Sequence, residues 1–464
     1  MVSDREKLLG EKKVLPLLIK YSIPAIIGMM VNALYNVVDR IFIGQGVGTL
    51  AIAGLAVAFP IMLVMMALAM LVGIGSATLI SIRLGEKKRN EAERLLGQSV
   101  SLLLIIFLSY TVISFIFMKP LLNLFGASDQ VLPYAAEYLS IILFGSTFFA
   151  FSMGLNHSIR AEGNPKIAMW TMLIGAILNI ILDPIFIFGL NMGIRGAALA
   201  TVIAQSVSAI WVLRYFMSGK SVLRLRFINM RLCRRLVFKI FAIGSAPFVM
   251  QLMSSVLVVL LNQGLRTHGG DIAISALGIV HSISMFIFMP VIGINQGAQP
   301  IIGFNYGARQ MQRVREALFW AILFATCIVT AGFLVTRLIP EQLIRLFNQD
   351  DLELLAVATR AMYLFMFMMP VVGFQVIASG TFQALGKPRK AMFLSLSRQV
   401  ILLIPLILIL PNFLGLDGVW MSIPIADVGS CILAAAFLVW EVKHWKKIHT
   451  DVVVDTHTPV EKSL

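Results

Sequence analysis

Long apolar stretches separated by short polar loops fill most of the chain. Each stretch is close to the roughly 20 residues that an α-helix needs to cross the hydrocarbon core of a bilayer. A helix also pairs its own backbone groups, which the membrane interior requires. We therefore predict an all-α integral membrane protein with twelve spans. The predicted spans are 16–38, 51–81, 95–118, 134–156, 167–188, 196–217, 236–262, 273–302, 316–338, 359–382, 391–411 and 418–441.

The motifs of the first six predicted spans return in the last six. The segment GNPKIAM, for example, is followed much later by GKPRKAM. Because a near-constant shift runs through six helices, the pattern indicates an internal duplication. We expect an N-lobe at 16–217 and a C-lobe at 236–441, related by an axis along the membrane normal. A shift of 222 residues relates Leu55 to Leu277, Gly85 to Gly307, Phe125 to Phe347 and Gly193 to Gly415.

Lysine and arginine residues gather on alternate loops. The N-terminal segment 1–15, the linker 218–235 and the C-terminal segment 442–464 belong to this basic set. The positive-inside rule therefore predicts that the linker and both termini are cytoplasmic. The net charge of +15 then reflects topology and contact with lipid headgroups. We expect membrane lipids as partners and no nucleic acid.

The composition fits a membrane protein, and the motifs exclude common enzyme classes. Hydrophobic residues make up 59% of the chain, charged residues only 13%, and the mean hydropathy is +0.89. The three cysteines are far apart, which predicts neither a disulfide framework nor a zinc site. The sequence contains no P-loop, no HExxH motif and no nucleophile elbow. We predict no enzymatic activity and no cofactor, so transport would draw on an ion gradient.

Asp183 is a carboxylate in the middle of the apolar run 174–189. A charge at the centre of a bilayer costs roughly 2.5–3.5 kcal/mol on insertion scales, so it needs a partner, a cavity or a bound ion. Asn179 lies one helical turn earlier on the same face. Pro184 removes a backbone donor beside it and is a candidate hinge. We interpret this point as a proton or cation site; the alternative is a structural, hydrogen-bonded carboxylate.

The first predicted span contains a second polar stripe that leads to Asp39. Pro24 lies in the same helix and permits a kink. The alternative is that Asp39 simply marks the extracellular end of the helix in water. The stripe favours a polar path inside the lobe, because its residues follow helical spacing. Its members are Asn32, Tyr35, Asn36 and Asp39.

Asp39 and Asp183 together would make a protonation switch. Burial disfavours the ionised form of a carboxyl group, and a second carboxylate nearby disfavours it further. Such a pair titrates as one unit. In the sixth span, Thr201 and Gln205 share a helix face, where the ordinary role of such residues is helix–helix contact. Thr201 could instead complete an oxygen shell for sodium, which prefers oxygen ligands.

The second half carries different intramembrane charges. Arg398 in the eleventh span and Asp427 in the twelfth form the obvious polar pair, for which a structural salt bridge is the expected role. The candidate coupling carboxylates therefore lie in the first half. Some of the 25 methionines and 31 phenylalanines would line the space between the lobes and contact flat organic cations.

Three motifs resemble the multidrug and toxic compound extrusion (MATE) family, and the resemblance extends over roughly residues 15–440. They are LNIILDPIFIFG in the fifth span, GxxGAAxAT at 193–201 and RAxGNP at 160–165. The chain is most similar to the bacterial branch of MepA-like multidrug exporters. This resemblance implies the two-lobe MATE fold and a location in the bacterial plasma (inner) membrane.

The resemblance also implies where the coupling ion, H⁺ or Na⁺, would bind. Carried over by position, that site consists of Asp39, Asn179, Asp183 and Thr201. Bending of the first helix near Pro24 would follow protonation. Another branch of the family uses acidic residues in the seventh and tenth spans, but here those spans contain Gln251 and no carboxylate. This difference moves the coupling site to the first lobe.

We therefore predict a secondary active exporter of organic, mostly cationic, drugs that works by alternating access between two lobes of one chain. One alternative is a flippase for lipid-linked oligosaccharides from the related superfamily, which would have a strongly cationic cavity; here Arg398 is the clear intramembrane basic residue. The other is a non-transporting membrane receptor, which would need a domain that these short loops do not supply. Dye efflux with and without an ionophore distinguishes the exporter from both.

Overall fold

The protein, seen in a computed structural model, is helical throughout the residues that the structure describes, 4–347 and 351–455. The side chains of residues 4–6, 36, 40, 49 and 446–455 lie outside this description. The helices of the first half are α1 (Asp4–Glu11), α2 (Val14–Gly46), α3 (Thr49–Gly85), α4 (Arg89–Ile116), α5 (Met118–Leu124), α6 (Leu132–Ala161), α7 (Pro165–Pro184), the π-helix η1 (Ile185–Gly189) and α8 (Gly193–Met217).

The second half begins after a linker that contains the short 3₁₀ helix η2 (Phe227–Met230). Its helices are α9 (Arg234–Gly307), α10 (Met311–Leu338), α11 (Pro340–Arg345), α12 (Leu352–Phe365), α13 (Met369–Ala384), α14 (Pro388–Leu396), the π-helix η3 (Ser397–Leu403), α15 (Ile404–Ile409), α16 (Pro411–Leu414) and α17 (Leu416–Asp455).

The number of membrane-crossing helices agrees with the predicted twelve once two breaks are considered. Within the described residues, ten helices are long and apolar enough to cross a membrane. One of them, α9, has 74 residues and breaks at Gly270, whose φ of 64° is a left-handed conformation that suits glycine, so it provides two spans. The pair α12 and α13, bent by 50°, provides one more. The prediction of a continuous helix at 359–382 is therefore wrong, because this span begins at Leu352 and is interrupted after Phe365.

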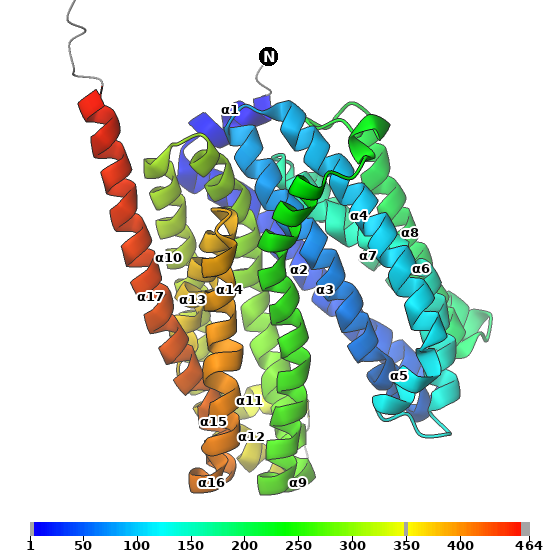
Figure 1. Ribbon diagram of the computed structural model, residues 1–464. Helices are drawn as coiled ribbons and strands as arrows, with labels where there is room; N and C mark the ends of the chain where they lie inside the picture. Colours follow the sequence, from blue (N-terminus) through cyan, green and yellow to red (C-terminus); the bar gives the residue numbers. More distant parts are fainter. Residues whose placement is uncertain (1–3, 348–350, 456–464) are drawn as a thin grey trace, which may run out of the picture.

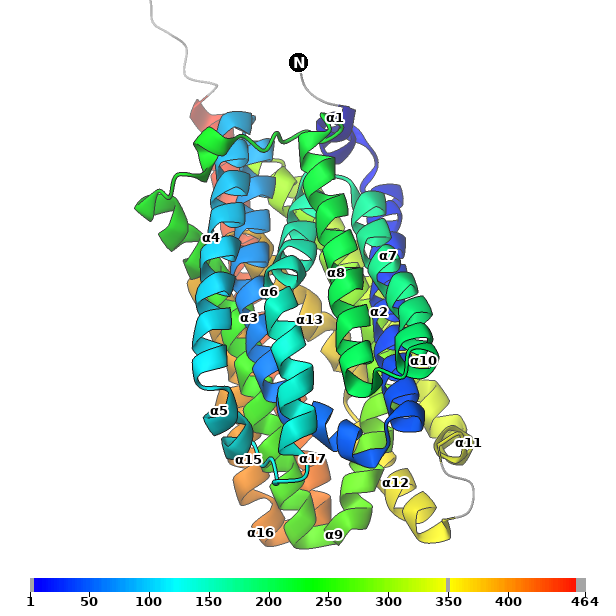
Figure 2. The ribbon, with the colours of Figure 1, turned by 90° about the vertical axis from the view of Figure 1, so that its right-hand side faces the viewer.

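The helices of the two halves meet at one end of the molecule and diverge toward the other (Figure 1). The end where they meet also holds α1 and the end of α17. At the opposite end, α5 of the first half and α16 of the second half lie on opposite sides of the view. A view turned by 90° shows α3, α6 and α8 of the first half in front of helices of the second half (Figure 2).

Glycines allow the two halves to approach closely where they meet. A Cβ atom on Gly85 of α3 would overlap the carbonyl oxygen of Phe304 in α9. A Cβ atom on Gly307 would overlap the carbonyl oxygen of Ile82 in α3. Gly307 lies 222 residues after Gly85, and Phe304 lies 222 residues after Ile82, which is the repeat shift. The same backbone contact is therefore made twice, once from each half.

The linker between the halves is fixed to the first half. Gln98 of α4 donates from Nε2 to the carbonyl oxygens of Asn229 at 3.0 Å and Arg231 at 2.5 Å. Its Oε1 accepts from the backbone N–H of Cys233 at 2.7 Å. Ser101 of α4 donates to the carbonyl oxygen of Met230 at 2.7 Å. The linker is therefore held against α4 up to Cys233, the residue that precedes α9.

Candidate cation-coupling site

Asp183 lies at the end of α7, where the helix changes its hydrogen-bonding pattern. Pro184 has no N–H to donate within the helix, and the next five residues form the π-helix η1. Such π-helical turns occur frequently at functional sites. Asp183 itself is 0% exposed. The local sequence thus places a carboxyl group at an irregular point of a membrane helix.

One amide group links the polar side chains of α7 and α8. Asn179 Nδ2 donates to Asp183 Oδ1 at 3.2 Å and to Thr201 Oγ1 at 3.3 Å. The helical spacing of Asn179 and Asp183 puts both on one face of α7. All three residues are buried. The arrangement presents a carboxylate, a carboxamide and a hydroxyl within one small region.

A second carboxyl group comes from α2. Asp39 is buried and lies close enough to Asp183 for a side-chain hydrogen bond between the two carboxyl groups, which requires that one of them be protonated. Two buried carboxylates at such a distance repel each other unless they share a proton or bind a cation. Helix α2 approaches α7 closely, because a Cβ atom on Gly28 would lie 2.8 Å from the Sδ atom of Met172.

Oxygen atoms dominate the site and leave capacity for a ligand. Asp183 Oδ2 and Asn179 Oδ1 are buried. When both carboxyl groups are ionised, neither oxygen accepts a hydrogen bond from the described part of the chain. Gln205 lies one turn further along α8 than Thr201. Its Oε1 is also buried and accepts no hydrogen bond from the described residues. Carboxylate, amide and hydroxyl oxygens suit a hard cation or a proton. The chemistry of these donors therefore fits the transport of either ion as a substrate.

The remaining residues of the predicted polar path lie on α2. Asn32 and Tyr35 are half-buried, and the side chain of Asn36 lies outside the described residues. Pro24 is buried inside α2, which continues through it as a single helix.

In the second half, Arg398 Nε lies 2.6 Å from Asp427 Oδ1, and Asp427 is buried. This pair joins η3 to α17 within the second half of the chain.

Sequence reasoning missed a buried polar group around Arg160. The predicted spans 134–156 and 167–188 leave Arg160 in the loop between them. This placement is wrong, because Arg160 belongs to the last turn of α6 and is only 7% exposed. It donates to Asn156 Oδ1 at 2.6 Å and to Gln296 Oε1. Nothing in the sequence connects Arg160 with Gln296. They are far apart along the chain, and Gln296 is uncharged, so it is not an obvious partner for a buried arginine.

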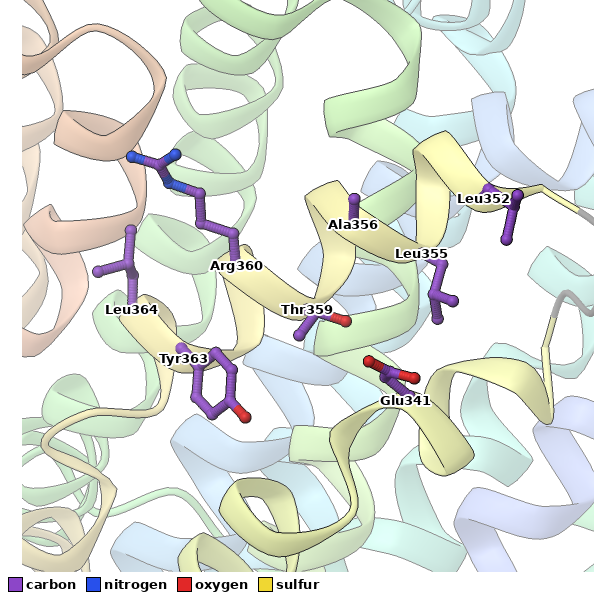
Figure 3. A pocket seen from close by; sticks show the side chains of 8 residues that line it. All are labelled: Glu341, Leu352, Leu355, Ala356, Thr359, Arg360, Tyr363 and Leu364. Carbon is purple, nitrogen blue, oxygen red and sulfur yellow. The ribbon is translucent and has the colours of Figure 1, made fainter.

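A surface pocket of about 400 Å³ lies elsewhere, between α11 and α12 (Figure 3). Its polar lining residues include Glu341 of α11 and Thr359, Arg360 and Tyr363 of α12. In Figure 3 the carboxylate of Glu341 points toward Thr359. None of the predicted coupling residues lines it. The pocket is therefore separate from the carboxyl pair.

The membrane-crossing helices, the duplicated halves and the buried carboxyl pair define a polytopic membrane transporter. The MatE family model matches residues 24–185 and 246–409. The chain therefore belongs to the MATE family of transporters, and the resemblance inferred from the motifs is confirmed.

Individual relatives agree with this assignment. Over 94% of this chain and 95% of the relative, the chain is 27% identical to the multidrug export protein MepA of Staphylococcus haemolyticus (strain JCSC1435). A solved structure of the MATE multidrug transporter DinF-BH is 44% identical and has a TM-score of 0.87, with 93% of this chain and 97% of that chain covered. An outward-facing multidrug resistance MATE family transporter is 26% identical with a TM-score of 0.91, over 96% and 100% of the two chains.

Proposed function

We propose that the protein exports organic, mostly cationic, drugs in exchange for H⁺ or Na⁺. The observation that carries this proposal is the buried carboxyl pair of Asp39 and Asp183, which Asn179 connects to Thr201. Membership of the MATE family supports transport, and the names of the relatives, multidrug export protein and multidrug transporter, support drugs as substrates. The coupling ion is the cation that occupies the carboxyl pair.

Neutralisation of the pair would change the contact between α2 and α7. When the site is empty and ionised, two like charges face each other in a buried region. A proton or Na⁺ cancels this repulsion and changes which hydrogen bonds the two carboxyl groups make. Bending of α2 near Pro24 would follow, as the resemblance implies, and Pro184 would supply a second flexible point in α7. Cation binding is thus converted into a change of helix position.

We propose that the halves act as lobes, 16–217 and 236–441, that alternate access between the two sides of the membrane. The basic segments 1–15, 218–235 and 442–464 support a cytoplasmic location for both termini. The helices of the two halves meet at the end that carries α1 and the last turns of α17 (Figure 1). With the proposed orientation, this arrangement would correspond to closure on the cytoplasmic side, the state in which drug would leave and cation would enter. One chain would contain the complete pathway.

The membrane potential supplies free energy for each net positive charge that moves inward. Moving one elementary charge through 100 mV provides about 2.3 kcal/mol. This free energy corresponds to a concentration ratio of roughly fifty-fold for each charge moved inward. Exchange of one H⁺ or Na⁺ for a drug with a single positive charge moves no net charge, so the potential contributes only where more positive charge enters than leaves. In a one-to-one exchange, the concentration gradient of H⁺ or Na⁺ supplies the free energy.

The assignment of Asp183 is tested with Asp183→Asn in vesicles that carry an imposed H⁺ or Na⁺ gradient. Asparagine keeps the shape of the side chain but cannot be ionised, so we expect gradient-driven export of ethidium to be lost. Asp271→Asn is a matched control, because Asp271 is an exposed acidic residue in α9. Unchanged export by the Asp183→Asn protein would refute the assignment.

A further inference from the structure

The buried guanidinium of Arg160 is bound only by neutral groups. Its partners are Asn156 Oδ1 at 2.6 Å, Met172 Sδ at 3.4 Å and Gln296 Oε1. It makes no ion pair within the described part of the chain. A buried charge usually has an opposite charge beside it. This one is compensated by hydrogen bonds to uncharged groups alone.

Gln296 belongs to the other half of the chain and contacts the first half twice. Its Oε1 accepts from Arg160 of α6, and its Nε2 lies 3.6 Å from Met29 Sδ of α2. The flanking glycines of α9 are packed against α2. A Cβ atom on Gly297 would lie 2.8 Å from the backbone nitrogen of Ser22, and one on Gly293 would lie 2.6 Å from a side-chain carbon of Ile26. Any separation of the halves here breaks the bond between Gln296 and Arg160.

We propose that Arg160 and Gln296 form the gate between the lobes on the cytoplasmic side, and that the neutral partner keeps this gate reversible. The inference rests on the proposed alternating access. In the closed state the guanidinium gains the Gln296 oxygen and loses water. In the open state it loses Gln296 and regains water. Because no carboxylate of the described residues pairs with Arg160, neither state is strongly preferred, so closure can be reversed by cation and drug binding.

A charge at position 296 tests this balance. Gln296→Glu has almost the same shape but would turn the bond into an ion pair, and charge-assisted bonds of this kind are about twice as strong as neutral ones. We expect the closed state to be stabilised about tenfold, and export to slow about tenfold, because the gate reopens rarely. Gln299→Glu is the matched control. Gln299 is on the same helix and bonds to Gln383, which is in its own half.

Closure itself can be measured by cross-linking. A Cβ atom on Gly303 of α9 would lie 3.0 Å from Ser81 Cβ of α3, so Ser81→Cys with Gly303→Cys reports contact between the halves. Cys233, Cys327 and Cys431 are first replaced by serine. Without drug or gradient, we expect Gln296→Glu to raise the rate of disulfide formation. Adding Arg160→Gln to Gln296→Glu should reduce the rate to the unmodified level or below, because the new carboxylate is then buried without a cation.

Two results would overturn the proposal. One is that Gln296→Glu and Gln299→Glu give equal cross-linking and equal export, with unchanged elution of the purified proteins. The other is that Arg160→Gln does not reverse the effect of Gln296→Glu. Cross-linking needs neither drug nor gradient, so it reports the gate even where Asp183→Asn leaves export unchanged and the cation-coupling proposal fails.

Discussion

At the scale of single residues, Asn179 organises the candidate cation site. Its one amide nitrogen donates to both Asp183 and Thr201, and it therefore fixes the distance between α7 and α8 at this point. A carboxamide is suited to this position because it supplies donors and an acceptor without adding charge. The neighbouring carboxyl groups thus keep their charge available for the cation that we propose binds there.

We predict that Asn179→Ala lowers the free energy of unfolding by about 1–3 kcal/mol, because two buried acceptors lose their donor. Gradient-driven dye efflux should fall at the same time, since the carboxylate of Asp183 loses its fixed orientation. Thermal unfolding in detergent and efflux from vesicles measure the two effects. Asn412→Ala serves as the control, because Asn412 is an exposed residue of the short helix α16. Similar losses in both proteins would argue against a specific role for Asn179.

At the scale of helices, α3 and α9 are held together by backbone contact at two glycines. Gly85 meets the carbonyl group of Phe304, and Gly307 meets the carbonyl group of Ile82. A side chain at either place would force the helices apart, because a carbonyl group in a helix cannot turn away. These contacts join the two halves where they meet. A change in their packing should therefore affect the proposed closure more than it affects the folding of either half.

We predict that Gly307→Ala disfavours closure by about 1–3 kcal/mol, the usual range for overpacking. Disulfide formation between Ser81→Cys and Gly303→Cys should slow accordingly. The control is Gly278→Ala on the same helix, where an added Cβ atom meets open space. If the two alanine variants cross-link at equal rates, the glycine contacts do not determine closure.

At the scale of the whole molecule, the sequence predicted the all-α membrane fold and the family, because apolar length and the repeat shift are direct consequences of a duplicated bundle. Asn179 could be placed beside Asp183 from helical spacing alone. The pairing of Asp39 with Asp183 could be suggested because both are carboxyl groups within membrane spans. Their assignment to one site with Asn179 and Thr201 came from the family resemblance, since spacing within one helix says nothing about another. The bond from Arg160 to Gln296 could not be predicted, because it depends on how two halves pack. The break between α12 and α13 was missed for a different reason, because the two pieces together read as one apolar run.

The central claim is that drug leaves in exchange for a cation bound at Asp183. It is tested most directly by recording dye efflux and cation uptake together, with the purified protein in vesicles at fixed pH, with and without Na⁺. We predict that each step of dye efflux is accompanied by inward movement of H⁺ or Na⁺ and that Asp183→Asn abolishes this cation movement. Dye efflux without any cation uptake, or uptake that persists unchanged in the Asp183→Asn protein, would contradict the claim.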